Sequence, residues 1–462
     1  MKLSEIIKGT NAAILHGSPA TEIGSICSDS RKCVPGSLFI AVKGFGADGH
    51  DFIPAALEAG AAAVVDASRR DLALCADNFY GHPSGKLQLV GITGTNGKTT
   101  TVTLLYNLFR GLGYECGLLS TIANYVGPRR SETANTTADP ITINSLMAEM
   151  VETGCQYCFM EVSSIGLEQE RVAGLEFRLA IFSNLTHDHL DYHKTFAEYL
   201  RCKKLFFDNL GKDATALVNA DDKNASVMVQ NCVAKVVSYS MRSAADHCCK
   251  VMEESFEGML MRIDGVETWV RLVGRHNASN LLAIYSAAVE LGTPKDEVLL
   301  ALSKLEAAPG RLEVIRGRRD LAVVIDYAHT PDALKNVLET LRAVAPKREL
   351  ICLFGCGGDR DRSKRPEIAA IAEKLADKVI VTSDNPRSED PEAIIDEIMT
   401  GFSKGSRKVV RITKREEAIK AAIQFAPDGA TILLAGKGHE TYQIIGTVKN
   451  HFDEREIVKT VL

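Results

Sequence analysis

The feature that most constrains the fold of this 462-residue chain is a glycine-rich segment, Gly94–Thr100, set between two apolar patterns. The apolar run Leu87–Ile92 predicts a buried strand before it. After it, four apolar residues from Val102 to Leu112 recur at intervals of 3, 4 and 3, on one face of a helix. A strand, a glycine loop and a helix in this order are the context of a phosphate-binding loop. The segment therefore predicts an α/β domain that binds a nucleoside triphosphate.

The loop supplies most of the predicted ATP contacts. Lys98 is placed to neutralise the β- and γ-phosphates, and Thr99 can offer its hydroxyl to Mg²⁺. The commonest form of this loop has a glycine six residues before the lysine, where this chain has Ile92, so the loop is a variant. The alternative is a turn whose glycines occur by chance. The residues assigned to ATP here are Gly94, Thr95, Asn96, Gly97, Lys98, Thr99 and Thr100.

Composition excludes several other classes of protein. The net charge of −5 argues against nucleic acid as a partner, and the basic run Arg360–Arg365 has no interleaved aromatic residues. No apolar stretch reaches the ~18 residues of a membrane span, and residues 1–8 lack the apolar region of a signal peptide. Twelve cysteines lie scattered, and the pair Cys155 and Cys158 would point to opposite faces of a strand. These features predict a cytoplasmic protein with free thiols.

The chain divides into three predicted domains. Turn-forming residues at 81–85 end a first α/β domain, 1–86, and the phosphate loop opens a central domain, 87–310. The third domain, 311–462, alternates strand-like and helical segments, which predicts a parallel sheet of Rossmann-like type. Its expected strands are 321–326, 349–354, 378–382, 408–412 and 431–435, and its expected helices are 331–345, 366–376, 391–402 and 415–425.

Ligands bind beyond the carboxyl ends of parallel strands, so the polar residues that follow each strand are candidate ligand contacts. Arg360 and Arg387 stand in two of these segments and can each bind a carboxylate or phosphate through two hydrogen bonds, as can Arg171 in the central domain. Composition alone favours a solvated surface charge for each of the three, and their positions at strand-to-loop junctions or beside motif residues argue against it. The segments are 326–329, 355–360, 383–387 and 436–440.

Two further segments predict a metal site. Glu161 ends an apolar run expected beside the phosphate loop, where its carboxylate could reach Mg²⁺; the alternative is a surface strand end. The segment His187–His193 holds three histidines and two aspartates, and His189 and His193 have the spacing of helical metal ligands. No H-E-x-x-H motif or distant cysteine pair completes a zinc site. A magnesium-linked role for His189 is therefore preferred to a zinc hydrolase or to structural packing.

Taken together, these motifs resemble the Mur ligases, the ATP-dependent amide-forming enzymes of peptidoglycan synthesis, over essentially the whole chain. The central loop matches their G-T-x-G-K-T-T, and segments 274–280, 310–311 and 326–332 resemble their nucleotide contacts. The resemblance implies an N-terminal nucleotide-sugar domain, a central P-loop ATPase domain with a mostly parallel sheet, and a C-terminal Rossmann-like domain. It also implies that adenine is contacted by Asn277 and Asn280, and that ribose and phosphate are contacted by Arg311 and Asp326.

Within the family, the segments 29–31, 135–137, 161–164, 169–171 and 188–193 are most similar to the diaminopimelate-adding members. The resemblance implies that one substrate is UDP-N-acetylmuramoyl-L-alanyl-D-glutamate. Its uridine nucleotide would be held by Ser28, Ser30, Phe45, Gly46 and Ala47. Its muramyl-dipeptide would be held by Asn135, Thr136, Thr137, Ser163, Gln169 and Arg171.

The resemblance further marks Lys203 as a lysine carbamylated by CO₂. A carbamate converts a cation into an anionic oxygen ligand, as a second Mg²⁺ requires. The residues alone leave Lys204 equally eligible. The implied catalytic residues are Lys98, Glu161, His189 and Lys203, and the implied metal ligands are Thr99, Glu161, His189 and carbamylated Lys203.

The resemblance also implies that the segment Asp384–Arg387 marks meso-diaminopimelate as the amino acid added, because lysine-adding members of the family have other residues there. Arg387 would pair with the distal carboxylate, which lysine lacks, and an unpaired polar site discriminates by ~10⁴ or more. Glu440 would balance the distal ammonium. The implied diaminopimelate contacts are Arg360, Asp384, Asn385, Pro386, Arg387, Gly436 and Glu440.

The expected reaction follows from this resemblance. The glutamate side-chain carboxylate attacks the γ-phosphate of ATP, and the amine of diaminopimelate then displaces phosphate from the acyl phosphate. The expected enzyme is monomeric. Two other readings remain open: a related ligase, such as a folylpolyglutamate synthetase or a lysine-adding relative, and a non-enzymatic ATP-dependent switch or scaffold.

Overall fold

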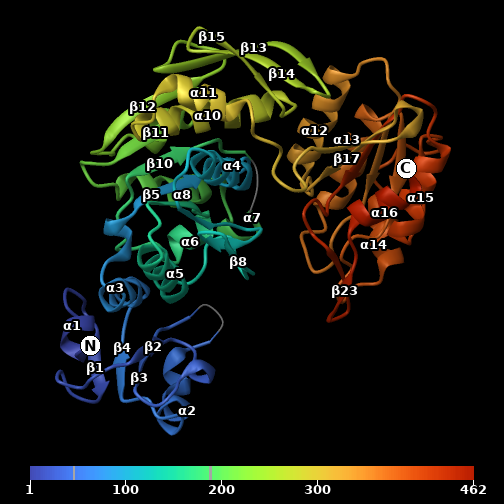
Figure 1. The fold of residues 1–462 in the computed structure, drawn as a ribbon. Coiled ribbons are helices and arrows are strands. Elements are labelled where there is room, and N and C mark those ends of the chain that lie inside the picture. Colours follow the sequence, from blue (N-terminus) through green and yellow to red (C-terminus); the bar gives the residue numbers. More distant parts are fainter. Residues whose placement is uncertain (45–46, 187–189) are drawn as a thin grey trace. The chain divides into compact units, whose positions relative to one another are not determined.

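A computed structural model describes residues 1–44, 47–186 and 190–462 of the chain (Figure 1). The described residues form two compact units. The first comprises Met1–Leu185, Thr195–Tyr239 and Ser286–Pro294, and the second comprises Thr186–Lys194, Ser240–Tyr285 and Lys295–Leu462. None of the helices in these described ranges is long and apolar enough to cross a bilayer.

The first unit begins with a four-stranded sheet of order β1-β4-β3-β2. Strand β3 (Ser37–Ala41) is buried throughout because alternate residues face two cores. Leu38 and Ile40 pack toward helices α1 and α3, whereas Phe39 and Ala41 pack toward α2. The other elements are α1 (Leu3–Ile6), β1 (Ala13–His16), β2 (Ser25–Cys27), η1 (Ser30–Lys32), η2 (Gly49–Phe52), α2 (Ile53–Glu58), β4 (Ala63–Asp66), α3 (Arg69–Phe79) and η3 (Pro83–Lys86).

The phosphate loop belongs to the next sheet of the first unit, in which the strands run β12-β11-β10-β5-β9-β6-β7-β8. Strands β10, β5, β9 and β6 pair in parallel, so their carboxyl ends meet at one edge. The strands are β5 (Gln88–Thr93), β6 (Cys116–Leu119), β7 (Asn124–Val126), β8 (Arg129–Ser131), β9 (Tyr157–Glu161), β10 (Leu179–Phe182), β11 (Thr215–Asn219) and β12 (Lys235–Ser240). The helices are α4 (Lys98–Gly111), α5 (Pro140–Glu152), α6 (Ser164–Glu168), α8 (Phe196–Asp208) and α9 (Ala225–Met228).

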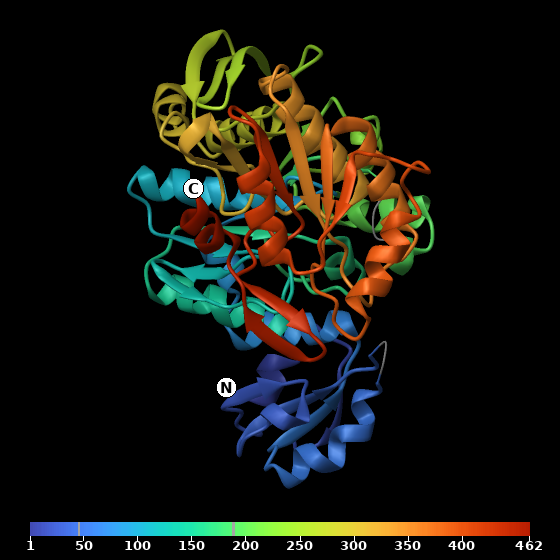
Figure 2. The same ribbon diagram turned by 90° about the vertical axis from the view of Figure 1, so that its right-hand side faces the viewer.

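The second unit contains an antiparallel meander and a six-stranded sheet of order β16-β17-β21-β18-β19-β20 (Figure 2). Helices α12, α13 and α14 cover one face of the six-stranded sheet, and α15 and α16 cover the other. The meander is β13 (His247–Ser255), β14 (Gly258–Ile263) and β15 (Val266–Val270). The sheet is β16 (Glu313–Arg316), β17 (Ala322–Asp326), β18 (Leu350–Phe354), β19 (Lys378–Val381), β20 (Val409–Arg411) and β21 (Thr431–Ala435). The remaining elements are α7 (Leu190–His193), α10 (Arg275–Glu290, which ends in the first unit), α11 (Lys295–Leu302), η4 (Arg318–Asp320), α12 (Pro331–Val344), α13 (Lys364–Leu375), α14 (Pro391–Met399), α15 (Arg415–Phe425), β22 (Tyr442–Ile445), β23 (Val448–His451) and α16 (Glu454–Val461).

The alternation predicted for residues 311–462 is confirmed. All five expected strands form and pair in parallel, and the four expected helices connect them. Thr330 and Asp390 cap α12 and α14, and a proline follows each cap, where its missing N–H is not needed. The antiparallel edge strand β16, the meander and the hairpin β22–β23 were not expected. The short strands β16, β22 and β23 carry partly or fully exposed residues, which gives a weak periodic signal.

Candidate active site

The phosphate loop connects β5 to α4, as predicted. Gly94 has a φ of +152°, and a Cβ there would lie 1.9 Å from the hydroxyl oxygen of Ser183. Gly97 has a φ of +89° and is the N-cap of α4. Both positions therefore need glycine, for close approach and for a left-handed backbone respectively. Ile92 is buried inside β5 opposite Glu161, so the turn starts two residues later than in the commoner motif.

The segment after β10 fixes the shape of this loop. Asn184 accepts a hydrogen bond from the backbone N–H of Thr95 at its carbonyl (2.9 Å) and one from Asn96 N–H at its side-chain oxygen (2.9 Å). Ser183 donates to the carbonyl of Asn96 (2.7 Å). No role was predicted for Asn184. Its place just after the apolar strand β10, which pairs in parallel with β5, was the available signal.

Two lysines meet at one carbonyl of the loop. Lys98 Nζ donates to the carbonyls of Gly94 and Thr95, both at 2.9 Å, and Lys203 Nζ donates to that of Gly94 at 2.9 Å. Lys203 is buried, 4.7 Å above the ring of Tyr199. Lys204, in contrast, forms an ion pair with Asp208 one turn along the same helix. Of the two lysines that the sequence left eligible, Lys203 therefore contacts the phosphate loop.

Glu161 lies beside this loop with a buried carboxylate. One oxygen accepts from the Thr99 hydroxyl (3.0 Å) and the other from Thr121 N–H (2.8 Å). Among the residues that the structure describes, no lysine, arginine or histidine forms an ion pair with Glu161. A buried carboxylate is costly without a counter-charge. Together with the Thr99 hydroxyl, it offers the hard oxygen ligands that Mg²⁺ prefers, so these residues fit the ion.

The residues assigned to the muramyl-dipeptide gather around the same end of β9. The Thr137 hydroxyl donates to the carbonyl of Glu161 (2.9 Å) and accepts from Ser163 N–H (3.0 Å). Arg171 donates to the carbonyl of Thr137 (2.6 Å) and through two nitrogens to Gln169 Oε1 (3.0 and 2.7 Å). Segments 135–137 and 161–171 are thus joined by side-chain contacts.

Two more residues extend this cluster. The Thr121 hydroxyl donates to that of Thr136 (3.0 Å), which ties the cluster to Glu161 through the Thr121 backbone. Asn135 is exposed, and its carbonyl accepts from Thr133 (2.8 Å). Thr121 was missed by the sequence analysis, because it follows β6, a strand that was not predicted.

The residues assigned to uridine lie at the N-terminal sheet. Ser28 is exposed and Ser30 half-buried where β2 leads into η1, and Ala47 is exposed. Asp29, between the serines, pairs with Arg31 through both carboxylate oxygens (2.9 and 2.8 Å). Three predicted site residues, Phe45, Gly46 and His189, lie outside the described residues.

The remaining residues assigned to the nucleotide lie in the second unit. Asn277 and Asn280 are buried on α10, where Asn280 Nδ2 donates to Asn277 Oδ1 (3.3 Å) and Asn277 Nδ2 donates to the carbonyl of Val273 (2.8 Å). Asp326 ends β17 and accepts from the backbone N–H groups of Leu312 (2.7 Å) and Ala328 (2.8 Å), while burial raises the pKa of its carboxyl. The guanidinium of Arg311 lies 4.8 Å above the ring of Tyr327.

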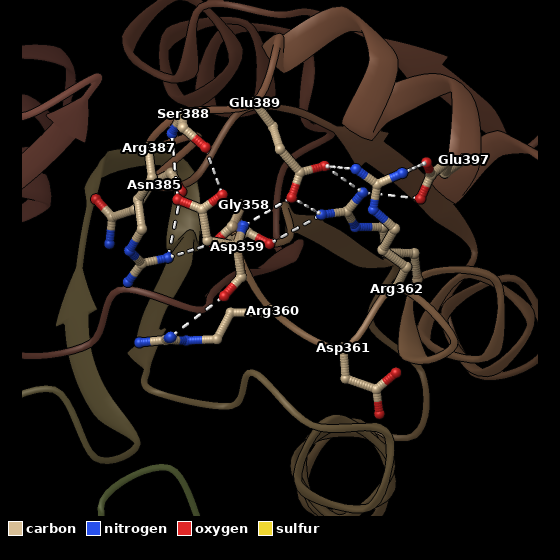
Figure 3. Close-up of polar contacts among 12 residues, drawn as sticks. Gly358, Asp359, Arg360, Asp361, Arg362, Asn385, Arg387, Ser388, Glu389 and Glu397 are labelled. Carbon is tan, nitrogen blue, oxygen red and sulfur yellow. Dashed lines mark hydrogen bonds and ion pairs between the residues drawn. The ribbon is translucent and has the colours of Figure 1, made fainter. Parts of the chain in front are cut away.

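All residues assigned to diaminopimelate meet at the carboxyl ends of β18, β19 and β21. Arg387 donates to the carbonyls of Gly358 (2.8 Å) and Asn385 (3.5 Å), and Arg360 donates to that of Asp359 (3.3 Å; Figure 3). In the part of the chain that the structure describes, neither guanidinium forms an ion pair with a carboxylate. The two arginines are therefore a pair of cations available to an anionic ligand group.

The run Arg360–Arg365, expected to be a small basic patch, is partly neutralised by carboxylates of other segments. Arg362 and Arg365 both pair with Glu389 and Glu397, and Arg365 is buried. The acidic partners come from the loop after β19 and from α14, more than twenty residues along the chain. The sequence run alone could not show this neutralisation.

A buried cation underlies the loop that carries Arg387. Lys437 Nζ donates to Asn385 Oδ1 (3.0 Å), Glu440 Oε2 (3.3 Å) and the carbonyl of Tyr442 (2.7 Å), and lies 3.8 Å from Asp384. Asn385 Nδ2 donates to the same oxygen of Glu440 (2.8 Å). The sequence analysis gave Lys437 no role, although it stands within the segment 436–440.

The charges around Asn385 leave one carboxylate in excess. Arg415 and Glu454 form a fully buried salt bridge at 2.8 Å, and Lys437 is shared between Glu440 and Asp384. Gly436 has a φ of +114°, and a Cβ there would lie 2.6 Å from Asp384 Oδ2, so no larger residue fits. An acidic site next to two free arginines suits a ligand end that carries both an ammonium and a carboxylate.

Comparison with known proteins identifies the family of this chain. Family models match residues 92–288 (Mur ligase middle domain), 310–438 (Mur ligase, glutamate ligase domain) and 22–83 (Mur ligase family, catalytic domain). UDP-N-acetylmuramoyl-L-alanyl-D-glutamate–2,6-diaminopimelate ligases of Cytophaga hutchinsonii and Phocaeicola vulgatus are each 49% identical, covering 100% of this chain and 99% of theirs. A solved structure of a ligase of the same name is 32% identical with a TM-score of 0.72, covering 100% of this chain and 98% of its own. The chain therefore belongs to the Mur ligase family, with its three-domain α/β fold.

Proposed function

We propose that this chain is the ATP-dependent, ADP-forming ligase that joins meso-2,6-diaminopimelate to UDP-N-acetylmuramoyl-L-alanyl-D-glutamate in peptidoglycan synthesis. The observation that carries the proposal is the pair Arg360 and Arg387, without a carboxylate partner in the described chain, beside the carboxylate excess around Asn385. The relatives that are 49% identical carry this activity in their names.

The second substrate follows from the charges of this site. Diaminopimelate ends in a carbon that bears both a carboxylate and an ammonium. The carboxylate would pair with Arg387 and Arg360, and the ammonium would offset the excess charge of Glu440 and Asp384. Lysine brings the ammonium without the carboxylate and would leave both guanidinium groups unpaired, which favours diaminopimelate by ~10⁴ or more.

The reaction requires two transfers. The side-chain carboxylate of the glutamate attacks the γ-phosphorus of ATP, which breaks the bond to ADP and gives an acyl phosphate. The neutral amine of diaminopimelate then attacks the acyl carbon, phosphate leaves, and an amide forms. Positioning and charge stabilisation account for catalysis of such transfers, and no covalent nucleophile on the protein is needed.

Residues of the first unit would carry out the phosphoryl transfer. Lys98 would bind the β- and γ-phosphates over the N-terminus of α4, and Thr137, Ser163 and Arg171 would hold the dipeptide. Mg²⁺ would be held by Thr99 and Glu161, with a second ion at His189 and at Lys203 as its carbamate; two such ions screen the charges that meet at the γ-phosphate. The carbamate is supported by the contact of Lys203 with Gly94, because its oxygens would then face the phosphate loop.

The remaining features of the proposal concern the whole molecule. The uridine nucleotide would bind at Ser28, Ser30 and 45–47. Adenine would bind at Asn277 and Asn280 on α10, and ribose and phosphate at Arg311 and Asp326. We propose domain boundaries at 86/87, which lies between the matched segments 22–83 and 92–288, and at 310/311, next to the start of the matched segment 310–438. We further propose a cytoplasmic monomer, in keeping with free cysteines throughout the described chain.

An amino-acid panel tests the proposal. ADP release with UDP-N-acetylmuramoyl-L-alanyl-D-glutamate is measured in the presence of meso-diaminopimelate, lysine or glutamate. Of the three amino acids, we expect only diaminopimelate to support rapid ADP release. Equal turnover with lysine would contradict the specificity for diaminopimelate. Turnover that depends on glutamate would indicate a folylpolyglutamate-type ligase. Slow ATP hydrolysis that neither substrate changes would indicate a non-enzymatic ATP-dependent switch or scaffold.

Substitution of Arg387 tests its role within this reaction. Arg387→Ala should raise the KM for diaminopimelate at least a hundredfold, since a charge-assisted bidentate pair of about 3 kcal/mol is lost, and should leave the KM for ATP within twofold. Arg387→Lys keeps the charge but cannot make a bidentate contact, so its KM for diaminopimelate should lie between those of the wild type and Arg387→Ala. Equal effects of Arg387→Ala on both KM values would rule out the assigned role.

A further inference from the structure

A buried ion cluster joins the two loops that carry the free arginines. Arg365, in the first turn of α13, binds Glu389 through both terminal nitrogens (3.0 and 2.9 Å) and Glu397 through one of them (2.7 Å). Its side chain is 1% exposed. Arg365 also donates to the carbonyl of Gly357 (3.2 Å), in the loop after β18. We call Arg365, Glu389 and Glu397 the arginine clasp.

The clasp ties together loops that are distant in sequence. Glu389 follows Arg387 by two residues and accepts a hydrogen bond from Asp359 N–H (2.7 Å), one residue before Arg360. Ser388 donates to Asp359 Oδ1 (2.5 Å), and Gly358 N–H donates to the carbonyl of Asn385 (2.9 Å). Every one of these bonds runs between the loop after β18 and the loop after β19.

Backbone strain shows that these loops need such support. Asp359 and Arg387 have φ values of +54° and +51°, in the left-handed region that residues with side chains rarely adopt. Residues remain in this region only where surrounding contacts hold them. Glu389 is ionised throughout the physiological range, because the guanidinium of Arg365 lowers the pKa of its carboxyl to about 2.

We propose that Arg365 and Glu389 are positioning residues for amino-acid specificity: their buried ion pair fixes the two loops so that Arg360 and Arg387 bind one ligand carboxylate together. The inference rests on the proposed function. Neither residue is among those assigned to diaminopimelate, so each would act through the two arginines. A bidentate contact tolerates little displacement, so loosening either loop weakens the grip on the distal carboxylate and leaves the rest of the site intact.

The chain offers a matched control. Arg362 binds the same two glutamates, at 3.0 and 3.2 Å, but its side chain is 64% exposed. An exposed pair of this kind contributes little, because solvent screens it. Arg362→Met therefore removes one positive charge from the same cluster without releasing the loops.

The experiment compares Arg365→Lys, Glu389→Gln, their double variant and Arg362→Met. For each full-length protein, ADP release gives kcat and KM for diaminopimelate, lysine and ATP. We expect the two single variants to raise the KM for diaminopimelate at least tenfold, with kcat/KM for lysine and the KM for ATP within twofold of wild type. Discrimination between the two amino acids should then fall at least tenfold. The KM of the double variant for diaminopimelate should be no higher than that of the more impaired single variant, since both residues act through one pair. Arg362→Met should match the wild type.

Several results would overturn the proposal. One is unchanged discrimination between diaminopimelate and lysine in a folded single variant. Another is a proportional loss of kcat/KM for both amino acids, as a purely structural role predicts. The third is an increase of KM in the double variant that equals the product of the increases in the two single variants. If Glu389→Gln or Arg365→Lys does not fold, Glu389→Asp keeps the charge and shortens the reach by one methylene, and the same tenfold loss of discrimination is required of it. Absence of diaminopimelate-dependent turnover in the wild type would instead refute the proposed function, so the two failures are distinct.

Discussion

The substitution Lys437→Met gives the sharpest test of the network below the diaminopimelate site. Lys437 has no exposed surface, and its ammonium bonds to Asn385, Glu440 and the carbonyl of Tyr442. Methionine has a similar length and volume, so the change removes one charge and little packing. Glu440 and Asp384 then lose the cation that they share, and the carboxylate excess of the network rises by one.

The magnitude follows from the burial of the pair. Removing one partner of a buried ion pair costs about 3–5 kcal/mol, because the other charge stays buried without compensation. For a domain of about 150 residues, each kcal/mol lowers the Tm by about 2–4 °C. Lys437→Met should therefore lower the Tm of the C-terminal domain by about 6–20 °C.

The assay has to report on that domain, because a chain of several domains does not unfold in one step. Hydrogen exchange measured by mass spectrometry on peptides from β19 and β21 gives the local free energy of opening. Lys449→Met is the matched control, since Lys449 is exposed and its ammonium lies above the ring of Tyr442 in the adjoining hairpin. The double variant Lys437→Met/Glu440→Gln should recover part of the loss. The reasoning would be refuted if the free energy of opening of Lys437→Met lay within about 1 kcal/mol of the wild-type value. It would also be refuted if the double variant were less stable than Lys437→Met.

Three further predictions concern the phosphate loop and the clasp. Lys98→Ala should lower kcat at least a thousandfold with an unchanged melting curve, since the residue acts on the phosphates. ADP release and thermal melting followed by circular dichroism check this, and a decrease of kcat below tenfold would contradict it. Lys203→Ala should abolish turnover, short-chain carboxylic acids should restore part of it, and Lys204→Ala should retain wild-type rates; a fully active Lys203→Ala would remove the carbamate. The folded-state pKa of Glu389, lowered to about 2 from the usual 4.5, means that its ionic contribution to stability is complete above pH 4.5 and lost as the pH falls toward 2. Glu389→Gln should therefore be less stable than wild type at pH 7 and equally stable near pH 2 in urea denaturation, and a constant difference over that range would contradict the assignment.

Much of the fold could be predicted from local pattern. The strand, loop and helix around Gly94 and the alternation after residue 311 depend on apolar periodicity and turn residues, which are properties of short segments. The strands that escaped prediction, such as β16 and β23, are short and partly or fully exposed at edges. Their residues are held by pairing with a neighbour strand, and no local pattern records that pairing.

The candidate site divides in the same way. Polar residues directly after predicted parallel strands were identified as candidates because strand ends share one edge of a sheet, and the structure brings 383–387 and 436–440 together there. Asn184 and Lys437 were missed, although each closely follows a buried parallel strand. Their roles lie in bonds to the backbone and side chains of other loops, which residue type alone does not specify.

By itself, the sequence determined the phosphate loop with its flanking strand and helix, the alternation after residue 311 and the polar residues at those strand ends, because these follow from spacing along the chain. Only the tertiary structure decided which of two similar residues carries a role. Lys203 contacts the loop at Gly94, 109 residues away, whereas the adjacent Lys204 pairs within its own helix. Arg365 is buried against Glu389, whereas Arg362 is exposed beside the same carboxylate. The physical reason is that burial and partner choice depend on which distant segments a fold brings within hydrogen-bonding distance, and the charge of a side chain acts according to that environment.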